Sequence, residues 1–344
     1  MSKYIFFFLV MLCACTNNNN GPAASTTPVD EASQSDAERK VHIIEAEALS
    51  ILDSSAVVEI IAQGFTWTEG PLPINNGDYF IFSDIPKNRI VKWKEGDSTT
   101  VFLQPSGYTG TIARGGELGS NGLLLHPDGG LVLMQHGDRR VAKLNAPLDN
   151  PKPEFTNLAD RFEGKRLNSP NDGVYHSNGD LYFTDPPYGL EGGLNDSTKE
   201  LDFQGVYRLK PNGHLDLVTK ALKFPNGITL SRDGKYLYVA SSDAQNMVWM
   251  EYELNEKGLI KKERIFYEVH QYEGKRKGAP DGMKMNKGGY LFATGPEGLW
   301  IFNPRGKLIA RIYTGQLTSN CAFSPDEKTL YMTCDDYIMR VRLK

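Results

Sequence analysis

Six copies of one pattern, in order along the chain, constrain the fold of this sequence more than any other feature. Each copy has a short polar head, a strand, a tight turn that usually contains Gly, and a second strand that alternates apolar and polar residues, as in "SPNDGVYHSNGDLYFTD" (Ser169–Asp185). Turns of this kind between alternating strands predict β-hairpins. The heads contain Glu69, Asn121, Asn171, Asn226, Asp281 and Asn320, at spacings of 52, 50, 55, 55 and 39 residues.

A period near fifty residues with about four strands per copy is typical of a β-propeller. Most copies have further strands after the hairpin, such as "RIVKWKE" and "GVYRLK". The sequence therefore predicts an all-β fold, a six-bladed β-propeller with a central divalent-metal site. We expect Val57–Gln63 to pair with the blade at the other end of the chain and so close the ring. Six unrelated hairpins in a sandwich are the alternative, and their ordered repetition argues against it.

The composition agrees with many short strands and excludes one class of partner. Hydrophobic residues make up 40% of the 344 residues, and the 34 Gly and 19 Pro suit frequent turns. The formal net charge is −4 and no stripe of Lys and Arg stands out, so we expect no nucleic-acid partner.

The N-terminus has the features of an export signal. Tyr4–Leu12 is an apolar run of signal-peptide length, too short to span a membrane. Ala14-Cys15 at its end resembles a bacterial lipobox, which predicts a lipidated Cys15; a plain signal peptide or a tail anchor is the alternative. We expect an exported, membrane-anchored lipoprotein that faces the periplasm or lies at the cell surface and touches the membrane only through this anchor. The expected boundaries are residues 1–15 for the signal, 16–45 for a flexible tether and 46–344 for the propeller.

The two cysteines beyond the signal do not form a disulfide framework by themselves. Cys321 and Cys334 are the two that follow Cys13 and Cys15. An exported protein could pair them, but two buried free thiols fit equally well.

The antiparallel meander of a blade places the six heads at one end of the propeller axis. Glu69, Asn171, Asn226 and Asp281 then meet there from four different blades. Two carboxylates and two amide oxygens match a hard divalent cation, with Ca²⁺ favoured and Mg²⁺, Mn²⁺ or Zn²⁺ as alternatives. The alternative is that these heads only form strand-entry turns.

The loops after the second strand of each blade, and the long loops between blades, reach the same end of the axis. Function often lies on loops that a rigid scaffold holds. We therefore predict that Asn121, His136, Arg139 and Tyr188 bind substrate, with a solvated loop charge as the alternative for Arg139. Asp185 is expected to fix a loop.

Several of these motifs together resemble one known family. The heads "EGP", "NSPNDG", "PNG" and "PDGM", the stretch "FTDPPYG" and the loop His136–Arg140 are similar to those of regucalcin (senescence marker protein), gluconolactonase and luciferin-regenerating enzyme, and most similar to bacterial gluconolactonase-like members. The resemblance covers roughly residues 60 to 344. It implies a six-bladed propeller that holds a divalent metal through Glu69, Asn171, Asn226 and Asp281, and the hydrolysis of a lactone or related ester.

Other hydrolase signatures are not found: the sequence has no Gly-x-Ser-x-Gly elbow and no His-Glu-x-x-His motif. A metal could instead polarise the lactone carbonyl for attack by water. Asp281 is the candidate catalytic base, and Glu69 is the alternative. We expect a metal-dependent lactonase acting on a small sugar lactone. A broader esterase or phosphotriesterase, or a non-catalytic sugar-binding propeller, are the alternatives.

Overall fold

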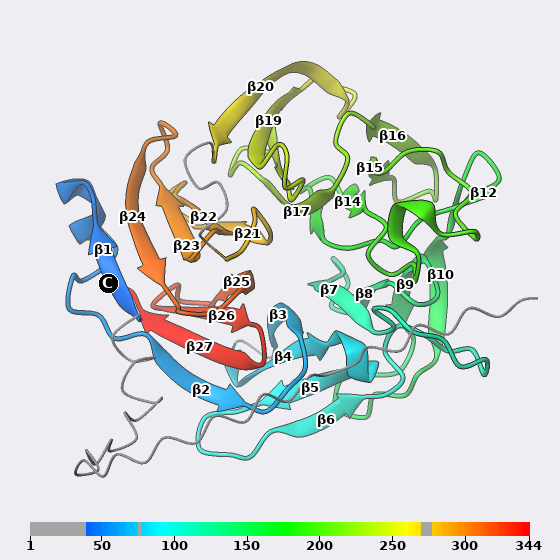
Figure 1. Cartoon of the computed structure of the whole chain (residues 1–344), viewed down its shortest axis with the longest axis horizontal. Coiled ribbons are helices and arrows are strands. Elements are labelled where there is room, and N and C mark those ends of the chain that lie inside the picture. The colour runs from blue at the N-terminus through cyan, green and yellow to red at the C-terminus, as the bar shows by residue number, and fades with distance from the viewer. Residues whose placement is uncertain (1–38, 75–76, 270–276) are drawn as a thin grey trace, which may run out of the picture.

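The computed structural model describes residues 39–74, 77–269 and 277–344, and these residues form six antiparallel sheets arranged as blades around a central axis (Figure 1). The predicted all-β, six-bladed propeller is thus confirmed. From the axis outward, the first three blades are β3 (Thr68–Ile74), β4 (Tyr79–Asp84), β5 (Arg89–Trp93) and β6 (Thr100–Leu103); β7 (Ser120–Leu125), β8 (Leu131–Gln135), β9 (Arg140–Leu144) and β10 (Phe155–Ala159); and β13 (Gly173–Tyr175), β14 (Leu181–Asp185), β15 (Gly205–Leu209) and β16 (Leu215–Thr219).

The other three blades follow the same plan, and two of them recruit a strand from the start of the chain. They are β17 (Pro225–Leu230), β18 (Tyr236–Ser241), β19 (Val248–Leu254) and β20 (Ile260–Glu268); β21 (Met283–Met285), β22 (Leu291–Gly295), β23 (Gly298–Phe302), β24 (Leu308–Tyr313) and β1 (Lys40–Ile43); and β25 (Thr318–Phe323), β26 (Thr329–Cys334), β27 (Tyr337–Arg342) and β2 (Glu59–Gln63). The described chain also has the ribbon β11 (Arg161–Phe162)–β12 (Lys165–Arg166) and the 3₁₀ turns η1 (Ala46–Ser50), η3 (Ile85–Lys87) and η4 (Gly193–Asn195).

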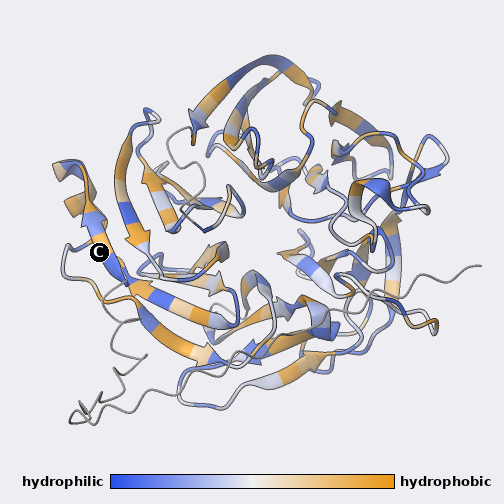
Figure 2. Cartoon of the chain, in the orientation of Figure 1, coloured by the Kyte–Doolittle hydropathy of each residue, from blue (hydrophilic) through white to orange (hydrophobic). Residues whose placement is uncertain are grey.

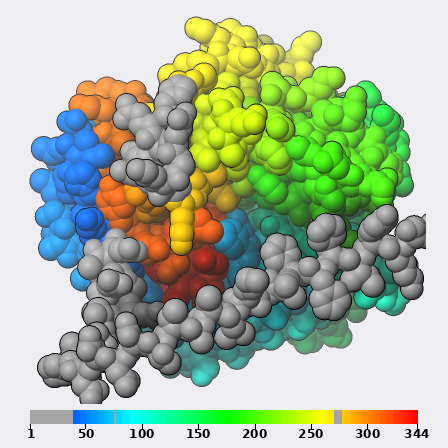
Figure 3. Space-filling view, in the orientation of Figure 1, coloured from blue at the N-terminus to red at the C-terminus, as the bar shows by residue number. Residues whose placement is uncertain are grey.

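Strand β2 closes the ring. It pairs antiparallel with β27, as predicted for Val57–Gln63, and thus joins the first part of the fold to the last blade. Arg340 of β27 donates from Nε to Oε2 of Glu59 at 2.6 Å across this pair. In the space-filling view the segments follow one another around the molecule in chain order, so the blue N-terminal strands lie beside the orange and red C-terminal ones (Figure 3).

Strand β1 belongs to the propeller although it lies before the expected start at residue 46. Residues 16–45 were expected to be a flexible tether, but Lys40–Ile43 pairs with β24 from Lys40↔Tyr313 to Ile43↔Ala310. Its short alternation of partly buried and exposed residues suffices for an outer strand that buries only one face. The blade that contains β24 therefore has five strands, and the propeller includes Lys40–Ile43.

The core lies between neighbouring blades, where alternate residues of each strand face the next sheet. The middle strands are covered on both faces, so that every residue of β8 and of β23 is buried, whereas the loops are mainly polar (Figure 2). Trp249 of β19 and Trp300 of β23 are fully buried, with ring centroids 5.5 Å apart, and Phe302 packs against both. Such aromatic pairs stabilise the contact between the blades beyond the area that they bury. In the described residues, no helix has the length and apolar character needed to cross a membrane.

Hydroxyl groups tie several heads to the neighbouring blade. Thr184 of β14 donates through Oγ1 to the backbone carbonyl of Asn226 at 2.6 Å, and Ser83 of β4 donates to that of Asn121 at 2.8 Å. The approach is so close that a Cβ on Gly227 would collide with the backbone of Asp281 in the next blade. The heads are therefore held against one another by the sheets around them.

Removal of β1 should weaken the closed ring. Deletion of residues 1–45 exposes the edge of β24 and removes Val41 and Ile43 from the apolar cluster that they cover. We expect the melting temperature to fall by at least about 3 °C, since about 1 kcal/mol corresponds to roughly 2–4 °C in a domain of comparable size. Thermal unfolding followed by circular dichroism measures this. Deletion of residues 1–38 is the control, and equal melting temperatures of the two proteins would contradict a stabilising role for β1.

Candidate active site

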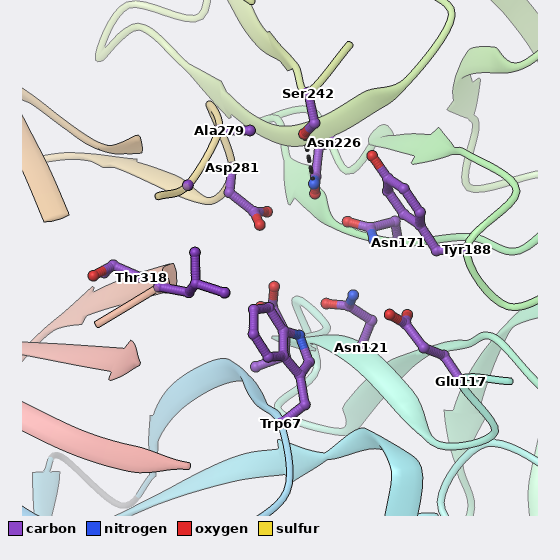
Figure 4. Close-up of a pocket in the computed structure, with 13 residues that line it drawn as sticks. Trp67, Glu117, Asn121, Asn171, Tyr188, Asn226, Ser242, Ala279, Asp281 and Thr318 are labelled. Atoms are coloured by element: carbon purple, nitrogen blue, oxygen red, sulfur yellow. Dashed lines mark hydrogen bonds between the residues drawn. The ribbon is translucent and has the colours of Figure 1, made fainter. Parts of the chain in front are cut away.

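A pocket of about 270 Å³ opens at the end of the axis where the heads meet (Figure 4). It is lined by residues from all six blades and from the loops between them, as expected for this end of the propeller. The lining residues are Trp67, Glu69, Glu117, Asn121, Asn171, Tyr188, Asn226, Ser242, Gly278, Ala279, Asp281, Leu317 and Thr318.

The four side chains predicted to hold a metal come together on this pocket. Glu69, Asn171 and Asn226 are each less than a tenth exposed, and Asp281 is partly exposed. In Figure 4 the carboxylate of Asp281 and the amide oxygen of Asn171 point into the same space. Four residues that lie up to 212 positions apart in the chain therefore present oxygen atoms to one cavity.

The amide of Asn226 is oriented by a second side chain. Asn226 donates from Nδ2 to Oγ of Ser242 at 2.9 Å, and Ser242 donates its own proton to the carbonyl of Pro280 at 2.6 Å. Because the Ser242 hydroxyl can then only accept from Asn226, the Asn226 amide must turn its oxygen away from Ser242. That oxygen is buried and has no hydrogen-bond partner among the described residues.

Two further oxygen atoms on the pocket also lack a hydrogen-bond partner in the described chain. Oδ1 of Asp281 and Oδ1 of Asn121 are buried and find no hydrogen-bond partner within the described residues. A buried polar atom without a partner is costly, so these pocket oxygens are free to bind a ligand or ion. Across the described ranges, no group of three or more His, Cys, Asp or Glu side chains is arranged to hold a metal. The predicted set has two carboxylates and two amides, and its all-oxygen chemistry fits a hard cation.

The pocket carboxylates lie in an environment that disfavours their charge. Burial raises the pKa of Glu69 to about 8, and the charge of Asp172 adds to this effect while hydrogen bonds from Gly70 and Asn320 oppose it. Burial also raises the pKa of Asp281 well above its ordinary value, with a further contribution from the charge of Glu69. Without a compensating cation, the folded protein therefore favours protonation of these groups.

A second polar layer lies beside the ligand set. Asn320 donates from Nδ2 towards Oε2 of Glu69 at 3.2 Å and Oδ2 of Asp172 at 3.4 Å. The ammonium of Lys284, on β21, lies 3.7 Å from Oδ2 of Asp172. Asp172 also accepts from the backbone N–H of Gly173 at 2.8 Å, so its carboxylate is held by neighbours and does not line the pocket.

The predicted substrate-binding residues divide into two groups. Asn121 and Tyr188 line the pocket, and the ring of Tyr188 stacks on that of Phe224. His136 is wholly buried behind Asn171 and is not part of the lining.

Arg139 does not line the pocket and is not exposed, so the expected substrate contact and its alternative, a solvated loop charge, are both wrong. Its side chain is buried and donates from Nε to the carbonyl oxygens of Leu167 and Asn168, at 2.8 and 3.1 Å, and from Nη1 to that of Thr198. The guanidinium is thus neither a pocket residue nor a solvated loop charge, because it holds the segment that leads to the third head.

Asp185 fixes that same segment from strand β14. Its two carboxylate oxygens accept from the backbone N–H groups of Asn168 and Ser169, both at 2.8 Å. Burial raises the pKa of Asp185 to about 7, and these hydrogen bonds oppose the shift.

The two cysteines of the described residues do not form a disulfide. Cys321 and Cys334 are both free and buried, as one of the two alternatives predicted.

Sequence reasoning missed several pocket residues. Glu117 lies on the long loop between the first two blades, Trp67 directly precedes β3, and Ser242 follows β18. The loop of Glu117 was expected at this end of the axis, but nothing in its sequence distinguishes Glu117 from a solvated carboxylate. The position of Ser242 after the second strand of its blade, matching Pro186 onward in the third blade, is the one signal that could have suggested it.

Comparison with known proteins identifies the family. Residues 67–335 match the model described as "SMP-30/Gluconolactonase/LRE-like region". The chain is 38% identical over 302 residues to a gluconolactonase of Zymomonas mobilis, covering 86% of this chain and 83% of that protein. It is 23% identical over 291 residues to a diisopropyl-fluorophosphatase of Loligo vulgaris, covering 79% of this chain and 87% of that protein. Its fold matches a solved gluconolactonase of Xanthomonas campestris with a TM-score of 0.75 and 27% identity, over 89% of this chain and 95% of that one. The resemblance seen in the motifs is confirmed: the chain belongs to the SMP-30/gluconolactonase/LRE-like family.

Proposed function

We propose that this protein is a metal-dependent hydrolase that opens a sugar lactone, as its relatives named gluconolactonase suggest. The observation that carries the proposal is the set of oxygen atoms on one pocket that come from four blades and include buried atoms without a partner. Glu69, Asn171, Asn226 and Asp281 would hold the cation, and Ca²⁺ suits their all-oxygen donor set best. When bound there, a divalent cation would act as a Lewis acid towards the lactone carbonyl.

Asp281 is the better candidate for the base that accepts a proton from the attacking water. It is partly exposed on the pocket side, and its Oδ1 has no hydrogen-bond partner within the described chain. Oε2 of Glu69 already accepts from the N–H of Gly70 at 2.9 Å and from Asn320 at 3.2 Å. These two bonds orient Glu69 and leave it less free to take up a proton.

The walls of the pocket suit a small polyhydroxylated ring. Asn121 and Tyr188 present an amide and a phenol that can bind hydroxyl groups, while Trp67 and Leu317 present apolar surface. A monocyclic sugar lactone needs polar partners around its edge and an apolar contact against its face. The substrate class that we propose is therefore a small sugar lactone.

A second candidate function is hydrolysis of phosphotriesters. The match to the relative named diisopropyl-fluorophosphatase covers 79% of this chain, so the same scaffold is associated with an organophosphorus compound in that protein. A comparison of an aldonolactone, an aryl ester and a chromogenic phosphotriester at equal concentration separates the candidates. We expect the largest kcat/KM for the aldonolactone.

Replacement of either carboxylate should abolish most of the activity. Glu69→Gln and Asp281→Asn keep the size of the side chain and remove a charge from the ligand set, so kcat/KM for glucono-1,5-lactone should fall at least about 100-fold. The rate is measured with a pH indicator after subtraction of spontaneous lactone opening, with and without a chelator. Asp233→Asn, an exposed carboxylate in a turn between strands, is the control and should hydrolyse like wild type. Unchanged rates in both pocket variants would exclude the proposed mechanism.

Calcium stabilisation should increase with pH. Because the pKa of Glu69 in the metal-free folded protein is raised to about 8, the folded state keeps a proton that the unfolded chain releases near pH 4.5. The metal-free protein therefore loses stability as pH rises from roughly 5 to 8. A cation needs the deprotonated carboxylate, so the increase in melting temperature caused by Ca²⁺ should grow over the same window. Glu69→Gln should flatten this dependence, whereas a shift that shrinks with pH would contradict it.

We also propose that the protein is anchored through Cys15, a residue outside the described ranges. The support is the sequence pattern of Tyr4–Leu12 followed by Ala14-Cys15. Wild-type protein expressed in bacteria should partition with membranes and incorporate labelled palmitate, and Cys15→Ser should do neither. Equal partitioning of both proteins would exclude lipidation at this position.

A further inference from the structure

The geometry points to a role for Glu117 and His136 that lies beyond the proposed ligand set. We propose that they are positioning residues that hold the amide of Asn171 with its oxygen towards the cation. This inference rests on the metal site of the proposed function. It assigns Glu117 a task that its sequence did not suggest, and it replaces the expected substrate contact of His136.

The backbone of Asn171 is fixed before its side chain is considered. Its N–H donates to the carbonyl of Thr184 at 2.9 Å, and its own carbonyl accepts from the N–H of Gly122 at 2.7 Å. These bonds tie the head to its own second strand and to the neighbouring blade. The open choice is therefore which atom of the Asn171 amide faces the pocket.

His136 makes that choice. Nδ2 of Asn171 lies 3.4 Å from Nε2 of His136, and His136 is wholly buried. An amide nitrogen can only donate, so this contact is favourable when Nε2 carries no proton. The amide oxygen then faces the pocket, as Figure 4 shows. Ser242 does the same for Asn226, where a hydroxyl accepts the amide proton.

Glu117 selects the form of His136 that can accept. Oε2 of Glu117 lies 2.9 Å from Nδ1 of His136, a close charge contact that is not aligned as a hydrogen bond. A carboxylate beside Nδ1 favours the tautomer with the proton on Nδ1, which leaves a lone pair on Nε2. The Glu117 carboxylate therefore sets the tautomer of the His136 imidazole, and the imidazole sets the orientation of the Asn171 amide. In known metal sites, partners that orient a ligand in this way affect metal affinity by about 10- to 100-fold.

The location of Glu117 suits this role. It lies on the loop between the first two blades, with its side chain about one third exposed, so it can be changed without opening the core. The loop ends at Gly119, whose carbonyl accepts from the backbone N–H of His136 at 3.2 Å. The loop and the imidazole are thus fixed to each other.

A double-mutant cycle on metal affinity tests the inference. Dissociation constants for Ca²⁺ are measured by calorimetry for wild type, Glu117→Ala, His136→Asn and the double variant. Asn at position 136 keeps a polar atom near Nδ1 but is too short to reach Asn171. We expect each single variant to weaken Ca²⁺ binding by about 10-fold or more, and the double variant to bind no more weakly than the worse single one. Thermal unfolding in chelator verifies that each variant is folded.

Glu117→Gln separates position from charge. Gln keeps an oxygen dipole beside Nδ1 and removes the negative charge, so we expect Ca²⁺ affinity within about threefold of wild type. Multiplied effects in the double variant, or a Glu117→Gln protein as weak as Glu117→Ala, would overturn the inference, because Glu117 would then act through its own charge. Unchanged affinity in Glu117→Ala would overturn it as well. If wild type itself binds no divalent cation, the proposed metal site fails and this inference fails with it.

Discussion

The closure of the ring is the constraint on which the site depends. Strand β2 pairs with β27, so the last blade meets the first, and the six heads are brought around one axis. Hydroxyl groups then tie individual heads to the blade beside them, as Thr184 does for Asn226. Asn171, Asn226 and Asp281 come from three consecutive blades and Glu69 from the first blade, so the closed ring is what brings Glu69 to the other three. The same closure buries the heads and thereby sets the electrostatics of the pocket.

The buried acidic groups at the axis support the proposed cation site. Burial raises the pKa of both Glu69 and Asp281, the charge of Glu69 raises that of Asp281 further, and the charge of Asp172 acts on both groups. Lys284 partly compensates the charge of Asp172, and Asn320 lies between Asp172 and Glu69. On the pocket side, unpaired oxygen atoms of Asn226 and Asp281 are left without a donor in the described chain. A divalent cation would satisfy both the charge and the unpaired oxygens.

Much of the fold, and the convergence of four head residues on one pocket, followed from the sequence, because both are encoded in a repeated pattern. The spacing of the heads predicted six blades, and the register of each head predicted that Glu69, Asn171, Asn226 and Asp281 would converge. The features that were not predicted are in segments that do not belong to the repeated pattern. Lys40–Ile43 is too short to signal a strand, and its pairing depends on the free edge of β24. Glu117 is one carboxylate in a Gly-rich loop, and its contact with His136 exists only in the folded ring. Arg139 resembles an exposed loop charge in the sequence, but its side chain reaches backbone carbonyls 28 and 29 residues away.

The central claim is that oxygen atoms from four blades hold one divalent cation. Anomalous diffraction from crystals of the active protein loaded with Mn²⁺ or Ca²⁺ tests it most directly. We predict one strong peak at the axis, within bonding distance of side-chain oxygens of Glu69, Asn171, Asn226 and Asp281. A protein that hydrolyses a lactone in the same buffer but shows no peak at this position, or a peak held by other residues, would contradict the account.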